Sequence, residues 1–551
     1  MRFLSPGWLA GLTAAAGVLS MILILDLTEY PFYVPRVLIF SYLLYHQDIA
    51  GSVLVIAIAL GAWLPRTRSG VLDFVGWLSR HPWTVAAATF AGLCAAVFAA
   101  GHNHALAGDE HLALFQSRVF AAGHLTGRFP PELVFRLVPD FYQWRWLIAS
   151  EQTGEVASMY WPGFSLLLAP FSLIGAPWAC NPLLASLSLV LIAKLAARLS
   201  GQPHAGGWAL LFALGSPGFI GMAISYFSMT AHLFMNALFA WLLLERTRRR
   251  LLAAGAVGSL ALVLNNPVPH ALFALPWIVS VARGPDGRRN FLRLAAGYAP
   301  LGLLLGLGWW LFLRTLQGAT PMALYPSDDD PLHRLGNLLW ALSLEFWKVF
   351  TLSDWRFGSR LLEQVRLWSW AVPGLPLLAL AGWWLSRNVA EARLLGWSLA
   401  CTLVGYLPVA FDQGSGWGAR YVHPAWSALP VLASLAVARA REDLQFYAAR
   451  VAVLSLLFAN ALRLFQIELF MDDQLSLRPP FEKGARQIVF INANPVNYAQ
   501  DFLQNDPYLR SPVIFMMSRG LGRDYDEIIR RRYPGARLVY DQPNGQVWRL
   551  D

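Results

Sequence analysis

The run Trp83–Gly101, WTVAAATFAGLCAAVFAAG, decides the class of fold. It holds nineteen residues in a row without one charged side chain, and about 20 apolar residues in a helix cross the hydrocarbon core of a bilayer. Similar runs recur along the whole chain. The expected spans are residues 8–26, 49–64, 83–101, 161–176, 180–199, 205–222, 226–244, 251–264, 270–282, 291–313, 368–386, 395–411, 421–438 and 449–469. The sequence therefore predicts an all-α polytopic membrane protein.

Composition supports a bilayer rather than water as the solvent of this chain. Of its 551 residues, 56% are hydrophobic and only 14% are charged, whereas a soluble globular chain carries roughly 25% charged residues. The net charge of +10 raises the question of nucleic acid as a partner. A nucleic-acid-binding domain would gather its basic residues on one soluble face, but here they form short clusters between apolar runs. Nucleic-acid binding is therefore not expected.

The basic clusters orient the spans, because loops rich in Lys and Arg stay on the cytoplasmic side. The segments expected inside are Arg66–Arg68, Arg246–Arg250, Arg283–Arg289, Arg387 and Arg439–Arg441. Residues 102–160, 265–269, 314–367, 412–420 and everything after 470 then fall outside. This alternation needs about 13 crossings. One of the runs 161–176, 180–199 and 205–222 must then fail to cross, and 161–176 is short and holds two prolines.

Two regions outside the spans have structure of their own. In residues 102–160, apolar residues at helical spacing (Leu112, Phe115, Val119 and Phe120) predict amphipathic helices on the membrane surface. After residue 470, strand-like segments at 488–492, 513–517, 536–540 and 546–550 surround a helical segment at 524–533. This alternation predicts a small C-terminal α/β domain.

The motif Gly108-Asp109-Glu110-His111 follows the run Trp83–Gly101 directly. Two adjacent carboxylates at a membrane edge are costly if they are merely buried, so they are candidates for a function by default. A carboxylate beside apolar surface can have its pKa raised enough to act as a general base. The alternative is a pair of solvated loop acids. The dipeptide alone does not decide between the two.

About thirty residues after this acidic segment, Tyr160-Trp161-Pro162-Gly163-Phe164 leads back into the membrane. The arrangement resembles the GT-C superfamily of membrane glycosyltransferases, and within it the protein O-mannosyltransferase branch that includes the lipid A aminoarabinose transferases. The resemblance covers residues 83–440 by the order of features. It implies that Asp109 deprotonates an acceptor hydroxyl and that Glu110 supports it, with His111, Tyr160 and Trp161 near the substrate.

The chain departs from that family in two places. Two extra spans precede the acidic loop, so the expected domains are 1–82 with extra spans, 83–470 as a GT-C-like catalytic region, and 471–551 as the α/β domain. Relatives often carry a second acid near the outer end of a later span, where this chain has Ser228, Thr230 and His232. His232 is a substrate-pocket candidate, although a lone intramembrane His more often bonds helix to helix.

A Gly-rich loop at an outer span edge reads Asp412-Gln-Gly-Ser-Gly-Trp-Gly-Ala-Arg420-Tyr421-Val-His423. Glycines allow a close approach of the backbone to a ligand, and guanidinium binds phosphate bidentately. Many members of the superfamily carry a similar Gly-x-Arg-Tyr here. Arg420 and Tyr421 are therefore predicted to bind the donor phosphate, with His423 in the pocket. The alternative is an Arg that reaches the lipid headgroups beside an interfacial Tyr.

Further candidates lie in the other outer segments. Lys348, Arg356 and Arg360 in the loop 314–367 are candidates for the same cationic pocket, although interfacial anchoring explains them as well. His270 follows a short Asn-Pro turn and is a pocket candidate. Asp328-Asp329-Asp330 leaves a divalent cation open, but consecutive acids without EF-hand spacing are usually a solvated turn. No metal site and no certain cofactor are predicted.

These features together predict an inverting glycosyltransferase. It would move a sugar from a polyprenyl-phosphate (undecaprenyl-type) donor to a hydroxyl of a glycan, lipid or protein acceptor. The expected location is the bacterial cytoplasmic (inner) membrane, with the active site and the C-terminus on the periplasmic side. An oligosaccharyltransferase or ligase that moves a whole glycan stays open. A transporter would predict two similar halves with charges at mid-membrane, and the sequence has neither. A non-enzymatic scaffold would leave the acidic segment unexplained.

Overall fold

A computed structural model describes residues 5–28, 39–63, 70–138, 142–143, 146–316, 354–409, 412–493 and 499–550, with the backbone alone for 354–357. The helical body begins with α1 (Pro6–Leu27), α2 (Ile39–Leu43), η1 (Leu44–Asp48), α3 (Ile49–Gly61), α4 (Val71–Arg80) and α5 (Pro82–Ala99). It continues with α8 (Gly163–Leu173), η3 (Pro177–Ala179), α9 (Cys180–Ser200), α10 (His204–Leu214), α11 (Pro217–Ala223), α12 (Met229–Leu243), α13 (Arg248–Leu262) and α14 (Val268–Arg283). It ends with α15 (Gly287–Leu301), η4 (Gly302–Leu307), α16 (Gly308–Leu316), α18 (Asp354–Ser369), α19 (Leu375–Leu385), α20 (Ala390–Tyr406), η6 (His423–Ala425), α21 (Ala428–Val437), α22 (Glu442–Leu454), η7 (Ser455–Ala459) and α23 (Asn460–Ser476).

The chain is a multi-pass membrane protein. In the described part of the chain, six helices are long and apolar enough to cross a bilayer. They are Pro6–Leu27, Ile39–Gly61, Pro82–Ala99, Pro177–Ser200, Gly287–Leu316 and Glu442–Ser476. Five shorter apolar helices, α8, α12, α14, α19 and α21, accompany them. The total of 13 crossings stays a prediction.

Of the three runs among which one is expected not to cross, only α9 with its 3-10 turn η3 forms a single long helix. α8 has 11 residues, which is about 16 Å of helix and half of a bilayer's hydrocarbon core. α10 and α11 are bent by 69° relative to each other. The bend lies where Pro217 starts α11, because proline cannot continue the preceding helix.

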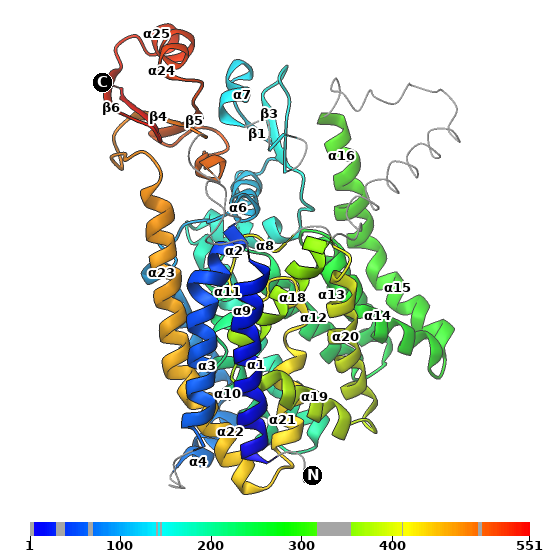
Figure 1. Ribbon diagram of the computed structural model, residues 1–551. Helices are drawn as coiled ribbons and strands as arrows, with labels where there is room; N and C mark the ends of the chain where they lie inside the picture. The colour runs from blue at the N-terminus through cyan, green and yellow to red at the C-terminus, as the bar shows by residue number, and fades with distance from the viewer. Residues whose placement is uncertain are drawn as a thin grey trace.

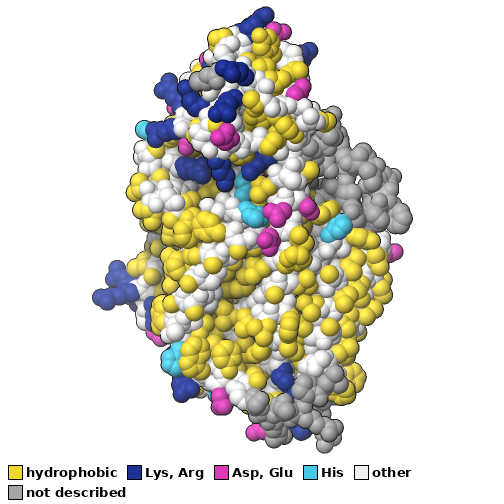
Figure 2. All heavy atoms as spheres, turned by 90° about the vertical axis from the view of Figure 1, so that its left-hand side faces the viewer, with side chains coloured by type: hydrophobic (Ala, Val, Ile, Leu, Met, Phe, Trp, Pro, Cys, Tyr) yellow, Lys and Arg dark blue, Asp and Glu magenta, His cyan; other side chains and the backbone are white. Residues whose placement is uncertain are grey.

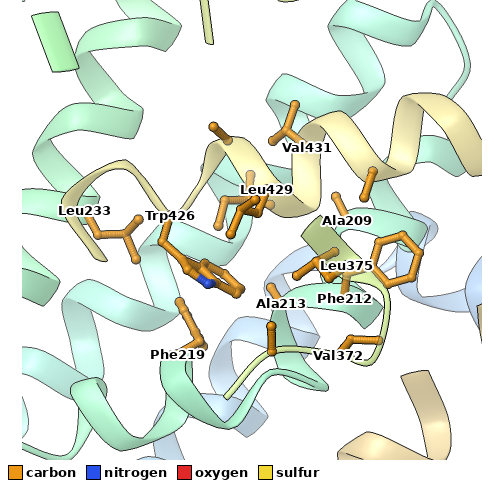
Figure 3. Close-up of a cluster of buried hydrophobic side chains, with 14 of the residues drawn as sticks. Ala209, Phe212, Ala213, Phe219, Leu233, Val372, Leu375, Trp426, Leu429 and Val431 are labelled. Carbon is orange, nitrogen blue, oxygen red and sulfur yellow. The ribbon is translucent and has the colours of Figure 1, made fainter. Parts of the chain in front are cut away.

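The core of the helical body lies where α10, α11, α12, α19 and α21 meet (Figure 3). The rings of Phe219 and Trp426 lie 5.6 Å apart there. Small residues let other helices approach closely. A Cβ on Gly382 in α19 would lie 1.8 Å from the carbonyl oxygen of Leu432 in α21. Outside this core the side of the body is mostly apolar, while Lys and Arg gather above it, over the C-terminal end of the molecule (Figure 2).

A cap of strands and short helices covers one end of this body (Figure 1). Its first part is α6 (Gly108–Ala121), β1 (Gly127–Arg128), η2 (Pro131–Leu133), α7 (Val134–Leu137), β2 (Leu147–Ala149) and β3 (Glu155–Ser158). Its second part is β4 (Gln487–Ile491), η8 (Ala499–Phe502), β5 (Val513–Met517), α24 (Leu521–Asp524), η9 (Tyr525–Ile529), α25 (Arg530–Arg532), β6 (Arg537–Gln542) and β7 (Gly545–Arg549). The C-terminal sheet has the order β5-β4-β7-β6, with β4 and β5 parallel and the other pairs antiparallel. The predicted C-terminal strands and helical segment are confirmed.

The expected surface helix in 102–160 is present as α6, but its predicted place on the membrane surface is wrong. Leu112, Phe115 and Val119 are buried and belong to one apolar cluster with Phe490 and Trp548 of the C-terminal sheet. The apolar face of α6 is thus covered by protein, because the C-terminal sheet offers it a better-packed partner than lipid. The acidic segment and the C-terminal sheet therefore lie at the same end of the molecule, opposite the N-terminus and α4 (Figure 1).

Candidate active site

Asp109 stands in the first turn of α6, where the unpaired backbone N–H groups and the helix dipole favour a negative charge. Its Oδ1 accepts a hydrogen bond of 2.5 Å from the Tyr160 hydroxyl. Its Oδ2 lies 3.0 Å from Nη1 of Arg420. The side chain remains 26% exposed. Three segments that are far apart in the sequence thus meet at one carboxylate that is still accessible.

Arg420 is held in place by the Gly-rich loop, residues 412–420. Gly414, Gly416 and Gly418 all have positive φ, of 61°, 126° and 64°, which glycine adopts without steric cost. The buried Gln413 closes this loop, because its Nε2 donates to the carbonyl of Gly418 at 2.8 Å and its Oε1 accepts from the backbone N–H of Arg420 at 3.0 Å. The acidic segment and the Gly-rich loop, both predicted on the outer side of the membrane, therefore meet at this centre.

Glu110 points away from Asp109 and is buried. Its carboxylate accepts hydrogen bonds from the backbone N–H groups of Leu106 at 2.8 Å, Ala107 at 3.2 Å and Tyr226 at 2.6 Å. Burial raises the pKa of Glu110 to about 7, although these three N–H groups oppose the shift. Glu110 therefore joins the start of α6 to the segment before α12, and this contact is how it can support Asp109.

Asp501 in η8 is a site residue that the sequence did not reveal. It accepts a hydrogen bond from the Tyr142 hydroxyl and one from the backbone N–H of Gly108. Burial raises its pKa to about 7, and the neighbouring charge of Asp109 adds to the shift. The C-terminal segment thus supplies a carboxylate directly behind the first residue of α6. No local motif marks it, because its partners lie more than 350 residues earlier.

A narrow crevice of about 10 Å³ opens beside the exposed edge of Asp109, which is no more space than one water molecule needs. Its lining residues are Asp109, Ala113, Tyr160, Trp161, Phe164, Ser165, Phe227, Ser228, Met229, Leu264 and Asn265. The Oδ1 atom of Asn265 is buried without a hydrogen-bond partner in the described part of the chain. Burial beside Asp109 raises the pKa of Tyr160 well above its usual value, so its hydroxyl stays a donor.

The other predicted residues of the Gly-rich segment lie near this centre but face elsewhere. Tyr421 stacks on Tyr406 with ring centroids 4.9 Å apart, and its hydroxyl donates to the carbonyl of Asp412 at 3.0 Å. The guanidinium of Arg360 lies 5.3 Å from the Tyr421 ring. His423 is buried against Trp426 and does not line the crevice. The ring of Tyr421 thus lies near the guanidiniums of both Arg360 and Arg420, and its hydroxyl is engaged by the loop.

The predicted histidines do not gather at Asp109. Both ring nitrogens of His270 are hydrogen-bonded, to Asn236 at 2.6 Å and to the Tyr298 hydroxyl at 2.7 Å. His270 therefore joins α14 to α12 and α15 and does not line the crevice beside Asp109. His232 in α12 is buried, and neither of its ring nitrogens forms a hydrogen bond within the described residues. His111 lies on the opposite side of α6 from the crevice, in a second cavity.

Some predicted residues lie outside the described part of the chain. Lys348 and the run Asp328–Asp330 belong to the undescribed segment, and only the backbone of Arg356 is described, in α18. Among the described residues, no group of three or more His, Cys, Asp or Glu is arranged to hold a metal ion.

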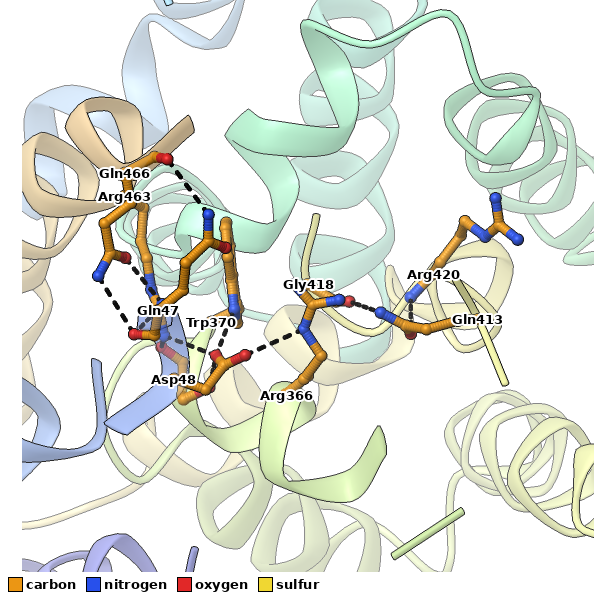
Figure 4. Close-up of polar contacts among 10 residues, drawn as sticks. Gln47, Asp48, Arg366, Trp370, Gln413, Gly418, Arg420, Arg463 and Gln466 are labelled. Atoms are coloured by element: carbon orange, nitrogen blue, oxygen red, sulfur yellow. Dashed lines mark hydrogen bonds and ion pairs between the residues drawn. The ribbon is translucent and has the colours of Figure 1, made fainter. Parts of the chain in front are cut away.

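A buried ionic network next to this centre was also not foreseen (Figure 4). Asp48 in η1 lies 2.9 Å from Nη2 of Arg463 in α23 and 3.2 Å from Nε of Arg366 in α18. Ser369 and Trp370 each donate to the same carboxylate at 2.7 Å. The extra N-terminal spans are thereby tied to the helix that carries Arg360, beside Tyr421.

Fold and site together define a multi-pass membrane protein with a carboxylate–guanidinium centre beneath a cap of mixed structure. No family model and no curated protein match the sequence. Two solved structures of ArnT from Cupriavidus metallidurans, both from the family that the sequence resembles, are similar in fold. The structure bound to undecaprenyl phosphate is 13% identical, with a TM-score of 0.49, over 85% of this chain and 98% of that chain. The apo structure is 14% identical, with the same TM-score, over 90% and 97%. Similarity of this size assigns no activity or ligand to this chain.

Proposed function

We propose that this protein is an inverting glycosyltransferase that uses a polyprenyl-phosphate-linked sugar and transfers it to an acceptor hydroxyl. The proposed location is the outer face of a bacterial inner membrane. The observation that carries this proposal is the pair Asp109–Arg420, joined at 3.0 Å across 311 residues of sequence. One side chain is a base for the acceptor, and the other is a cation for the departing phosphate.

Arg420 is suited to the donor phosphate by charge and by position. Its Nε has no hydrogen-bond partner among the described residues, while Nη1 is engaged by Asp109. A phosphate that takes over Nη1 releases the carboxylate of Asp109. The crevice of about 10 Å³ is too small for a sugar, so donor binding has to separate Arg420 and Tyr160 from Asp109. The base is therefore released only when the donor is present.

The transfer itself is a single displacement at the anomeric carbon. The acceptor oxygen forms a bond to that carbon as the bond to the phosphate oxygen breaks, and the acceptor proton passes to Asp109. Arg420 stabilises the negative charge that develops on the leaving phosphate, and fixed charges of this kind contribute strongly to such steps. One displacement inverts the configuration. Before the donor binds, Tyr160 holds Asp109 in position through its 2.5 Å hydrogen bond.

The test uses purified protein in proteoliposomes with radiolabelled polyprenyl-phosphate monosaccharides and a glycan acceptor mixture. Asp109→Asn removes the base, and we expect the transfer rate to fall by about 10²–10⁴-fold. Arg420→Gln removes the phosphate cation, and we expect a loss of about 10²–10³-fold. Glu151→Gln and Arg128→Gln change exposed residues of the same cap and should leave the rate unchanged.

Two outcomes decide between this reaction and its rivals. Transfer at the wild-type rate by Asp109→Asn would refute the proposed chemistry. Activity only with a donor that carries a complete oligosaccharide would replace monosaccharide transfer by the oligosaccharyltransferase or ligase alternative. Movement of the labelled lipid across the membrane without transfer would assign transport instead.

A further inference from the structure

A second cavity, of about 320 Å³, lies on the opposite side of α6 from the Asp109 crevice. It is formed where the start of α6 faces η3, the end of α8 and the segment before α12. The side chains that give it its character are Asn103, His104, His111, Arg118, Trp178 and Tyr226. It is the larger of the two cavities by far, and the proposed transfer chemistry does not use it.

The lining of this cavity offers hydrogen-bond donors and positive charge without a carboxylate. His111 is only 5% exposed, and neither its ring nor the guanidinium of the exposed Arg118 has a hydrogen bond or ion pair within the described residues, although both residues form the backbone hydrogen bonds of the helix. Buried polar side chains normally have a partner. Glu110, which precedes His111 in the chain, turns its oxygens to backbone N–H groups instead. Burial, with Arg118 and His104 nearby, lowers the pKa of His111 to about 3, as expected where a further positive charge is unfavourable.

The rim of the cavity is apolar and faces outward. Ser172 and Gly175 line it, and between them Leu173 and Ile174 are 70% and 74% exposed. Phe98 at the end of α5 is half exposed and packs edge-on against Trp178, which lines the cavity. Exposed side chains of this kind at the end of membrane helices contact lipid. A ligand in the cavity therefore has hydrocarbon beside it.

We propose that this cavity is a second ligand site, which binds the phosphate-bearing headgroup of a membrane amphiphile. Arg118 pairs with the phosphate, because guanidinium and phosphate form charge-assisted hydrogen bonds. The imidazoles of His104 and His111 and the amide of Asn103 donate to the rest of the headgroup. The tail lies along Leu173, Ile174 and Phe98. This inference does not rest on the proposed glycosyl transfer.

The test measures binding to the purified full-length protein in maltoside micelles by calorimetry. Dihexanoyl phosphatidic acid supplies phosphate and tail, inorganic phosphate supplies the anion alone, and hexanoylglycerol supplies a tail alone. We expect phosphatidic acid to bind at least tenfold more tightly than either of the others. Arg118→Ala should weaken it about tenfold, the loss of a charged hydrogen bond. Arg118→Glu should abolish binding, and Arg118→Lys should retain most of it.

Two further variants separate this site from others. Arg128→Ala removes an exposed arginine of the same cap and should bind as the wild type does. Arg420→Gln disables the proposed donor site and should leave phosphatidic acid binding intact. The proposal would be overturned if Arg118→Glu bound phosphatidic acid with the affinity of the wild type. It would also be overturned if Arg420→Gln lost this affinity instead. If inorganic phosphate bound as tightly as phosphatidic acid, the claim that the ligand is a lipid would be refuted. If hexanoylglycerol bound as tightly, the claim that the site recognises phosphate would be refuted.

Discussion

Replacing Asp48 by Asn isolates the charge at the centre of the network in Figure 4. The side chains of Asp48 and Arg366 are fully buried, and that of Arg463 is 2% exposed. Asn has the same shape and keeps one acceptor oxygen for Ser369 and Trp370. It loses the negative charge between the two arginines, and its NH₂ group would face another donor, Nε of Arg366.

The loss of folding stability expected for Asp48→Asn follows from the burial of the two arginines. Removing one partner of a buried ion pair costs about 3–5 kcal/mol, because it leaves a buried charge without compensation. Globular proteins gain about 2.1 cal/mol/K of entropy per residue on unfolding. For a chain of 551 residues, that destabilisation lowers the midpoint of thermal unfolding by about 3–4 °C if the whole chain unfolds together, and by more if only part of it does.

The assay is thermal unfolding in detergent, followed by tryptophan fluorescence. Asp443→Asn serves as the matched control, because that aspartate is 48% exposed and its ion pair is with the exposed Arg441. Asn can still accept the hydrogen bond from the backbone N–H of Leu444, so a shift below 1 °C is expected. The double variant Asp48→Asn/Arg366→Met removes one of the two guanidiniums that Asp48→Asn leaves without a counter-charge and should recover part of the loss. The electrostatic account would be refuted if Asp48→Asn had the same unfolding midpoint as the control variant. It would also be refuted if the double variant had a midpoint no higher than that of Asp48→Asn.

Three more predictions concern the cap and the loop. Because the pKa of Asp501 is raised to about 7, its stabilisation is complete below about pH 4 and is lost as the pH rises through 7. Asp501→Asn should remove this part of the pH dependence of the unfolding midpoint between pH 4 and 8, and an unchanged profile would count against the buried contact. Gly416→Ala should lower the transfer rate, since a Cβ there would press on the side chain of the site arginine. Gly484→Ala, with a similar positive φ but open space around it, should not. With the native cysteines replaced, Asn103→Cys should react with an impermeant thiol reagent from outside and Arg249→Cys only from inside; the reverse labelling would invert the proposed orientation.

The class of fold and the centre of the site were accessible from local sequence. Uncharged runs such as Trp83–Gly101 predict spans, because a charged side chain is energetically costly in the hydrocarbon core of a bilayer. Asp109 and Arg420 were found separately, each from a short motif at the edge of a run. Charge placement put both edges on the same side of the membrane, but only the packing of the whole chain brought the two side chains to 3.0 Å.

The structure corrected what depends on partners distant in the sequence. His270 satisfies Asn236 and Tyr298, partners that its local sequence does not reveal. His111 turns to the second cavity, because residues two positions apart on a helix stand on nearly opposite faces. The apolar face of α6 has the same spacing whether it meets lipid or protein. Only the placement of the C-terminal sheet decided that it meets protein.

By itself, the sequence determined that the chain is a membrane protein, that it has a small α/β region near its C-terminus, and that it carries an acid and a guanidinium at span edges. Periodicity and charge placement are local properties that act through the solvent. Tertiary structure alone decided that Asp501 stands behind α6, that Asp48 reaches the helix of Arg360, and that α6 separates two cavities. Those features join residues hundreds of positions apart, and such contacts form only when the whole chain is packed.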